Sequence, residues 1–294
     1  MRRESVQYGL NVNKYEEVKN VQKTNRKIDV KLSVVHLTLI FLVGILLGRV
    51  SLLLNQSDSK GIAPFGIAYL MAIAIRNNKQ KNISAGAGVL LGCYTVMDSL
   101  SDGNMYLIAI SILTLCYLII PINKRVKREI LGFALILSTF FIYGAVINKY
   151  EFGVNATLCL VETVMIMPIY YVIKYAVDSI EEFDYKYLFS TEQLVSISIL
   201  FCLMVSGIGN VEFMNYSLKN ICALFLVLSV AYLGGAAYGA MIGVAMGIIL
   251  GVASSDMMWS IGFFSVGGLI VGIFKDTGKI FSILAGIIIY FALG

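Results

Sequence analysis

The sequence has little charge, proline and histidine. Only 14% of its 294 residues are Asp, Glu, Lys or Arg, whereas soluble domains carry about 25%. Hydrophobic residues make up 58% of the chain and the mean hydropathy is +0.82. This composition excludes a water-soluble surface, so we expect the lipid bilayer to be the solvent. Three prolines against 27 glycines favour helices that pack closely in lipid, because small residues let backbones approach.

Arrangements of residues that carry catalysis or bind metals are also missing. The five cysteines stand singly within apolar runs, without a CxxC pair. His36 is the one histidine, and no nucleophile is paired with it. Asp98 and Asp102 are carboxylates at helical spacing, but the Gly103 and Asn104 that follow favour a turn. We therefore predict no catalytic, cofactor-binding or metal site in this chain.

Apolar runs divide most of the chain and predict an all-α polytopic transmembrane bundle of about ten to eleven spans. The predicted spans lie near 34–54, 62–75, 83–97, 105–122, 130–147, 154–173, 194–209, 218–235, 237–253, 259–274 and from 280 onward. Two of these runs, 62–75 and 83–97, are short for a bilayer, which needs roughly 17 to 25 helical residues. Each is the partner of a tilted neighbour, a half-helix or a re-entrant segment, and the alternation of loop charges favours a true crossing for both. Pro64 and Gly61 favour a broken helix there.

Lys and Arg residues are concentrated in alternate loops. The loops between the basic segments hold one Lys or Arg residue or none. The basic segments hold eight, three, four, two and two, in the order 1–33, 76–82, 123–129, 174–193 and 275–279. Cytoplasmic loops carry the excess of positive charge. We therefore predict a basic cytoplasmic segment at 1–33 and a multi-pass transmembrane domain at 34–294. The formal charge of +5 is attributed to topology and attraction to anionic lipids, not to nucleic-acid binding.

Three connecting regions give further expectations. The acidic loop 174–193 has apolar residues at helical spacing, so it is either an amphipathic helix on the cytoplasmic face or a solvated connector. Ser190 and Gln193 fit a capping box, and the uncharged GGAA at 234–237 predicts a turn. Because the chain stops within an apolar run, we expect a longer gene product with another crossing and a soluble domain.

A stripe of glycines runs through residues 234–251. Its members recur every four residues and share one helix face: Gly235, Gly239, Gly243, Gly247 and Gly251. Such a stripe lets another helix approach closely. Packing within the chain's own bundle is the first interpretation, and a homo-oligomer contact is the alternative. Gly44 and Gly48 form a weaker version.

Two ionisable residues lie within apolar runs, Arg49 and Glu162. At 1.5 Å per residue they lie roughly 8 Å and roughly 12 Å from the outer ends of their spans. We hypothesise that they form an intramembrane ion pair, since buried charges require partners. The alternatives are a protonated packing residue or an ion-path residue at Glu162, and an Arg49 that reaches the outer headgroups.

Two segments resemble a known family. GIAPFGIAYLMAIA (61–74) opens a short span with Pro-Phe-Gly, and 234–286 joins the glycine stripe, a polar turn, a glycine-rich span and the basic FKDTGK stop. Together they resemble the N-terminal membrane domain of the stage II sporulation protein E family of endospore-forming Firmicutes. The resemblance covers residues 30–294 and implies ten spans.

The resemblance also implies a three-part protein. Its membrane domain precedes a segment that engages the tubulin-like division protein and a manganese-dependent serine phosphatase. That phosphatase acts on an anti-anti-sigma factor and releases the forespore sigma factor at the asymmetric septum. A manganese site needs clustered aspartates, whereas the inside-facing aspartates of this chain are scattered between helices. No catalytic residue of the family therefore carries over, and Mn is expected only in the absent phosphatase domain. The scattered aspartates are Asp29, Asp178, Asp184 and Asp276.

The expected function is therefore membrane anchoring, septal localisation and regulation of such a phosphatase. The expected partners are the lipid bilayer, a second copy of the chain and, through absent domains, the division protein and the anti-anti-sigma factor. The alternative is a small-solute transporter or channel that uses Glu162 and the broken span near Pro64. A third interpretation is a structural membrane protein that recruits partners.

Overall fold

The computed structural model describes residues 34–53, 61–100, 102–120, 124–182, 190–209, 211–213, 216–254, 257–278 and five positions between 281 and 288. The predicted segment 1–33 and most of the run from 280 lie outside the described residues. The chain divides into two compact units, Met1–Ile40 and Phe41–Gly294.

The described residues are almost entirely α-helical, which confirms the predicted all-α class. The helices are Val34–Gly48, α2 (Pro64–Ala74), α3 (Lys79–Thr95), α4 (Gly103–Ile119), α5 (Arg125–Val146), α6 (Phe152–Glu182), α7 (Thr191–Ser206), α8 (Leu218–Gly234), α9 (Ala236–Ser254) and α10 (Met257–Ile273). Two short 3₁₀ helices accompany them, η1 (Met97–Ser99) and η2 (Phe274–Thr277). Two short antiparallel pairs join β1 (Leu52–Leu53) to β2 (Gly61–Ile62) and β3 (Glu212–Phe213) to β4 (Tyr216–Ser217).

The helices differ in whether they are long enough to cross a membrane. Among the described residues, three segments are long and apolar enough to cross a bilayer: Arg125–Val146, Phe152–Glu181 and Met257–Thr277. The other apolar helices are shorter. The 11-residue α2 is about 16 Å long at 1.5 Å per residue, against a hydrocarbon core of about 30 Å. The all-helical membrane character is therefore supported, and the number of ten to eleven spans stays a prediction.

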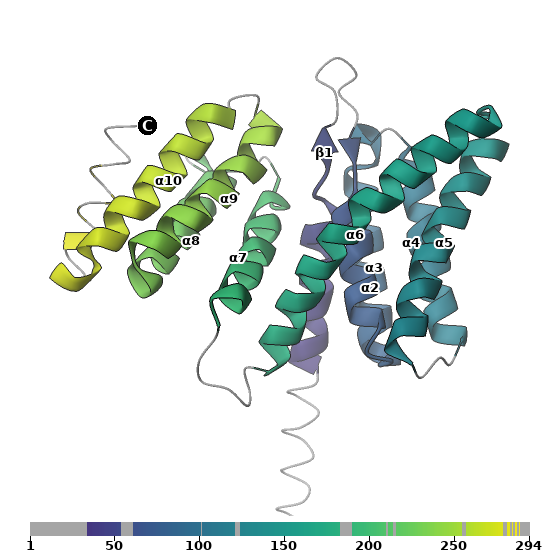
Figure 1. The fold of residues 1–294 in the computed structure, drawn as a ribbon, viewed down its shortest axis with the longest axis horizontal. Helices are drawn as coiled ribbons and strands as arrows, with labels where there is room; N and C mark the ends of the chain where they lie inside the picture. The colour runs from purple at the N-terminus through teal and green to yellow at the C-terminus, as the bar shows by residue number, and fades with distance from the viewer. Residues whose placement is uncertain are drawn as a thin grey trace, which may run out of the picture. The chain divides into compact units, whose positions relative to one another are not determined.

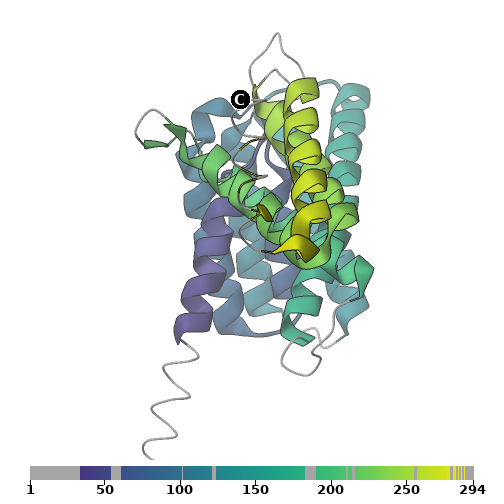
Figure 2. The ribbon, with the colours of Figure 1, turned by 90° about the vertical axis from the view of Figure 1, so that its left-hand side faces the viewer.

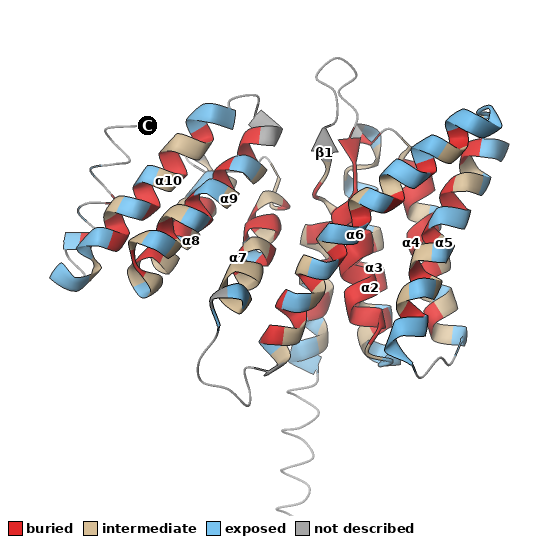
Figure 3. Cartoon of the chain, in the orientation of Figure 1, coloured by how far each residue is buried: buried red, intermediate tan, exposed pale blue. Residues whose placement is uncertain are grey.

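The short helix α2 lies inside the bundle. All its residues from Pro64 to Ala74 are buried, and Figure 3 shows it red along its length. Pro64 occupies the first turn, where its missing N–H breaks no helical hydrogen bond. The predicted break therefore exists, as the pair β1–β2 followed by α2. The predicted span 34–54 needs correction, because its helix ends at Gly48 and residues 52–53 form β1.

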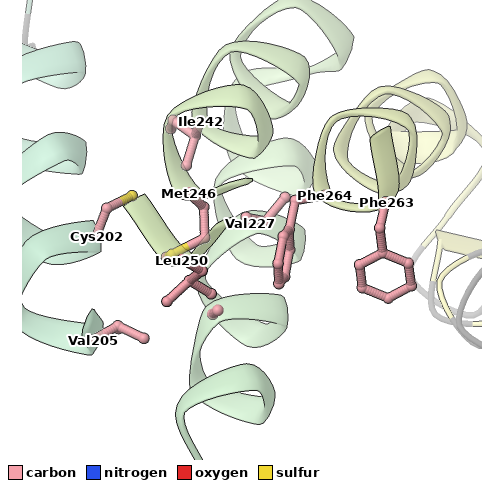
Figure 4. Packing of buried hydrophobic residues seen from close by; sticks show 9 residues of the cluster. Cys202, Val205, Val227, Ile242, Met246, Leu250, Phe263 and Phe264 are labelled. Atoms are coloured by element: carbon pink, nitrogen blue, oxygen red, sulfur yellow. The ribbon is translucent and has the colours of Figure 1, made fainter. Parts of the chain in front are cut away.

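The helices from α2 to α6 pack in sequence order. α3 contacts α2 and α4, α5 contacts α4 and α6, and α6 returns to cover α2 (Figure 1). In the remainder of the chain α9 contacts α7, α8 and α10, and Figure 2 shows α9 and α10 running side by side. Buried apolar side chains of these four helices form one cluster (Figure 4): Cys202, Val205, Ala223, Val227, Ile242, Met246, Leu250, Phe263 and Phe264.

The connecting regions agree with the sequence in two places and differ in one. The capping box is confirmed, since the Gln193 amide donates to Ser190 Oγ (3.3 Å) and the Ser190 amide donates to Gln193 Oε1 (3.0 Å). Gly235, with φ of +93°, makes the predicted turn between α8 and α9. The acidic segment up to Glu182 forms no separate interfacial helix, because it continues α6 as one 31-residue helix. Residues 183–189 of that prediction lie outside the described residues.

Candidate functional site

The glycine stripe of α9 faces α10. A Cβ atom at any of four positions would collide with the α10 backbone: Gly239, Gly243, Gly247 and Gly251. The contact is reciprocal, since a Cβ at Gly268 would overlap the carbonyl group of Gly239. The two backbones therefore touch directly, as small residues allow. In this structure the stripe serves packing within one chain.

The fifth glycine of the stripe has another role. Gly235 follows α8 in a left-handed conformation that glycine adopts without strain. The Lys275 ammonium lies against it, because a Cβ on Gly235 would sit 3.0 Å from Lys275 Nζ. A cation at this place interacts favourably with the carbonyl end of α8.

A second close contact joins the first helix to α3. A Cβ at Gly48 would lie 2.6 Å from the carbonyl oxygen of Val89. On the α3 side, Cβ atoms at Gly88 and Gly92 would overlap the carbonyl groups of Phe41 and Ile45. The Gly44 and Gly48 pattern indicated half of this contact, and the spacing of Gly88 and Gly92 on α3 is the signal that could have completed it.

The structure does not bring Arg49 and Glu162 together. The Arg49 guanidinium lies beside Gly209, where an added Cβ would be 2.6 Å from Nη2. Glu162 instead accepts a long hydrogen bond (3.5 Å) from the Tyr106 hydroxyl of α4. The ion pairs of the described side chains include neither residue. Matched depth fixes the height of two groups in a bundle but not the face that each occupies, so the hypothesised pair does not form.

A group of contacts lies at one end of the helices α2–α6. Asn148 Nδ2, after α5, donates to both carboxylate oxygens of Asp102 at 3.3 Å. Asp102 precedes α4, and Gly61 of β2 bridges Leu100 in the same α3–α4 connection. The strand pair β1–β2 and the connections α3–α4 and α5–α6 therefore share one end of this group of helices (Figure 1).

The opposite end carries an ionic clamp, by which we mean Arg76, Lys81, Asp178 and Glu181. Arg76 Nη2 lies 2.6 Å from Asp178 Oδ1, and Arg76 also pairs with Glu181. Lys81 Nζ lies 2.9 Å from the same Glu181 carboxylate. The Arg76 side chain is 10% exposed, against 36% and 38% for its two partners. The clamp thus fastens the α2–α3 connection to the last turns of α6.

A further ion pair, Glu129 of α5 with Lys174 of α6, brings the start of α5 to this end. The basic segment 76–82, residues 124–129 and the end of α6 therefore lie together. These pairs were missed, because the acidic residues of 174–193 were assigned to a solvated or interfacial segment. Their signal is present in the sequence, since Asp178 and Glu181 are three residues apart and share one helix face.

The chemistry available to these residues is packing and charge pairing. Among the described residues, no group of three His, Cys, Asp or Glu side chains lies close enough to hold a metal ion.

Comparison with known proteins shows the family of this chain. The model of the family described as SpoIIE, N-terminal domain, matches residues 1–293. The chain belongs to this family. Stage II sporulation protein E of Bacillus subtilis (strain 168) is 28% identical over 88 residues, which are 30% of this chain and 11% of that protein. No solved structure matches. The resemblance found in the sequence is thus confirmed, and the matched part of the relative is a small share of its length.

Proposed function

We propose that this chain anchors a sporulation serine phosphatase in the cell membrane and directs it to the asymmetric division septum. The family match over residues 1–293 carries the proposal. Apolar helices supply the means of anchoring, because three of the described segments are long enough to cross a bilayer. The division protein and the anti-anti-sigma factor would bind other domains of such a protein. The domain would pass its oligomeric state to the phosphatase.

We further propose a multi-pass topology with the amino terminus in the cytoplasm. Its support is the grouping of the basic residues of 76–82 and 124–129 at one end of α2–α6, since positive loops are cytoplasmic. Exposed Lys127 lies in the first turn of α5, and exposed Lys149 lies at the opposite end in the α5–α6 connection. We expect a membrane-impermeant maleimide to label K149C in intact cells and to label K127C only after lysis. The reverse pattern would overturn the orientation.

The localisation can be tested with a fluorescent fusion of this chain in sporulating Bacillus subtilis cells. We expect fluorescence in the membrane with enrichment at the asymmetric septum. A polytopic membrane protein of another family, fused to the same fluorophore, controls for the doubled membrane at the septum. If both fusions show equal enrichment, the localising role is wrong even if the anchoring role holds.

Transport of a small cation is the second candidate. Glu162 favours it, because this carboxylate lies within α6 and no ion pair of the described side chains includes it. Proton and sodium flux into proteoliposomes would be compared for the parent chain, Glu162→Gln and the exposed control Glu151→Gln. Flux that Glu162→Gln abolishes and Glu151→Gln leaves intact would establish transport. Absence of flux in the parent chain would remove this candidate.

A further inference from the structure

The start of α5 gathers positive charge that nothing described in the protein neutralises. Lys124, Arg125 and Lys127 are exposed, and Arg128 is 2% exposed. The one acidic residue of this stretch, Glu129, is already paired with Lys174. None of the ion pairs among the described side chains includes any of the four cations.

Arg128 is the most informative of these cations because it is enclosed without an anion. Its Nη2 donates a hydrogen bond to the Tyr117 carbonyl oxygen (3.3 Å), and its guanidinium carbon lies 5.2 Å from the centre of the Tyr117 ring. Nε and Nη1 are buried and have no acceptor. An enclosed charge without a counter-ion is strongly unfavourable. The guanidinium thus lies between the last turn of α4 and the first turn of α5, where a nearby anion would neutralise its charge.

The first turn of α5 offers further donors to an anion. The residue before it, Lys124, forms no side-chain capping hydrogen bond. The first amide groups of a helix have no partner within the helix. They carry the positive end of the helix dipole, which makes such a turn an anion site. Amide groups, exposed cations and the enclosed guanidinium therefore attract the same kind of ligand.

Apolar side chains border these cations. Ile119 of α4 is 74% exposed, and Val126 and Ile130 of α5 are 66% and 63% exposed. A soluble anion would leave these apolar side chains exposed to water, whereas the acyl chains of a lipid would cover them. The helix α5 is long and apolar enough to cross a membrane, and a crossing would place the cations at its start at headgroup depth.

We propose that the start of α5 binds the phosphate headgroup of an anionic phospholipid. Lys124, Arg125 and Lys127 contact the headgroup, Arg128 adds its unneutralised charge from beneath, and the acyl chains cover the apolar border. Basic sites between helices at the cytoplasmic surface recognise anionic lipid headgroups by such means. The proposal requires that α5 crosses a bilayer and is independent of septal localisation.

The test uses the full chain purified in detergent, with bound lipid counted by native mass spectrometry. The probes are phosphatidylglycerol, phosphatidylcholine and inorganic phosphate. We expect phosphatidylglycerol to bind more tightly than phosphatidylcholine. The triple variant K124Q/R125Q/K127Q should lose about 100-fold in affinity for phosphatidylglycerol, at about fivefold for each cation near the surface. Arg128→Lys keeps the charge but not the planar fork of donors and should lose less.

Lys79→Gln is the matched control, because it removes an exposed cation from the other basic connection at this end. It should leave phosphatidylglycerol binding within about twofold of the parent, the scatter expected for a charge outside the site. Since the three substituted side chains of the triple variant are exposed, its thermal unfolding should match the parent. Equal binding by parent and triple variant, or an equal loss in Lys79→Gln, would overturn the site. Full competition by inorganic phosphate would replace the lipid with a soluble anion and overturn the proposal as stated.

Discussion

Gly243→Ala is the sharpest test of the contact between α9 and α10. A Cβ at this position would lie 2.6 Å from Ser265 Cα and would overlap the carbonyl group of Phe264. Both obstacles are backbone atoms, so no side-chain rotation can relieve the collision. Carbon atoms ordinarily approach to about 3.5–4.0 Å, so the two helices must separate by about 1 Å locally. Such a gap forfeits about a quarter to a half of the attraction of each contact along the seam.

The expected magnitude is a difference between two effects. Overpacking typically destabilises by about 1–3 kcal/mol, and replacement of a helical glycine by alanine stabilises by about 1 kcal/mol. Gly243→Ala should therefore lower the free energy of unfolding by up to about 2 kcal/mol, or Tm by up to about 8 °C for a chain of this size. The matched control is Gly262→Ala in α10, where an added Cβ meets no atom within 4 Å. It should leave Tm unchanged or raise it.

Thermal unfolding in detergent can be followed by the fluorescence of Trp259. It is the one tryptophan of the chain and stacks on Phe263 of α10 at 5.1 Å between ring centres. An equal Tm for Gly243→Ala and Gly262→Ala would refute the packing argument. A Gly243→Ala protein that keeps its Tm but loses an oligomer in size-exclusion chromatography would assign the stripe to a contact between copies.

The ionic clamp and Glu162 give two further predictions. Arg76→Gln should destabilise the chain by only about 1 kcal/mol, because the partners of Arg76 are more than a third exposed and water screens them. A double-mutant cycle of Arg76→Gln with Glu181→Gln should show a coupling energy that weakens in 1 M salt. A control cycle of Lys79→Gln with Glu181→Gln should show no coupling. Glu162→Gln should leave Tm unchanged or raise it, since the amide oxygen still accepts from Tyr106 and the charge is removed. Tyr106→Phe should cost about 1 kcal/mol through the lost donor, and a large fall in Tm for Glu162→Gln would show that the carboxylate is needed as a charge.

Helix positions could largely be predicted from the sequence, because each predicted apolar run up to residue 274 contains a helix of the structure. The ends were less predictable. The helices α3 and α5 begin at Lys79 and Arg125, several residues before their apolar runs at 83 and 130. Hydropathy marks the part of a helix that leaves water, whereas backbone hydrogen bonds continue into the polar interface. The helix α6 extends past its run to Glu182 for the same reason.

The neighbours of each helix could not be predicted in the same way. An apolar run indicates that a helix has apolar surroundings, but lipid tails and apolar side chains of other helices are equally suitable surroundings. The Arg49–Glu162 hypothesis therefore failed on direction and not on depth. Backbone contact was easier to foresee, since the glycine stripe marks the one face of α9 on which a helix can approach closely. The clamp required knowledge that α2 and α6 are neighbours, and their charges alone do not specify it.

Two kinds of contact hold this bundle, and each suits its surroundings. Between helices in lipid there is little hydrophobic driving force, so association depends on close packing and polar contacts. Glycine seams supply the close packing for α9 with α10 and for the first helix with α3. Ion pairs occur at the ends of α2, α3, α5 and α6, where one partner remains partly hydrated and desolvation is less costly. Exposed apolar positions such as Leu233, at 79% exposure, contribute to neither contact. They should accept other apolar residues freely, whereas a methyl group added on a glycine seam should lower the free energy of unfolding.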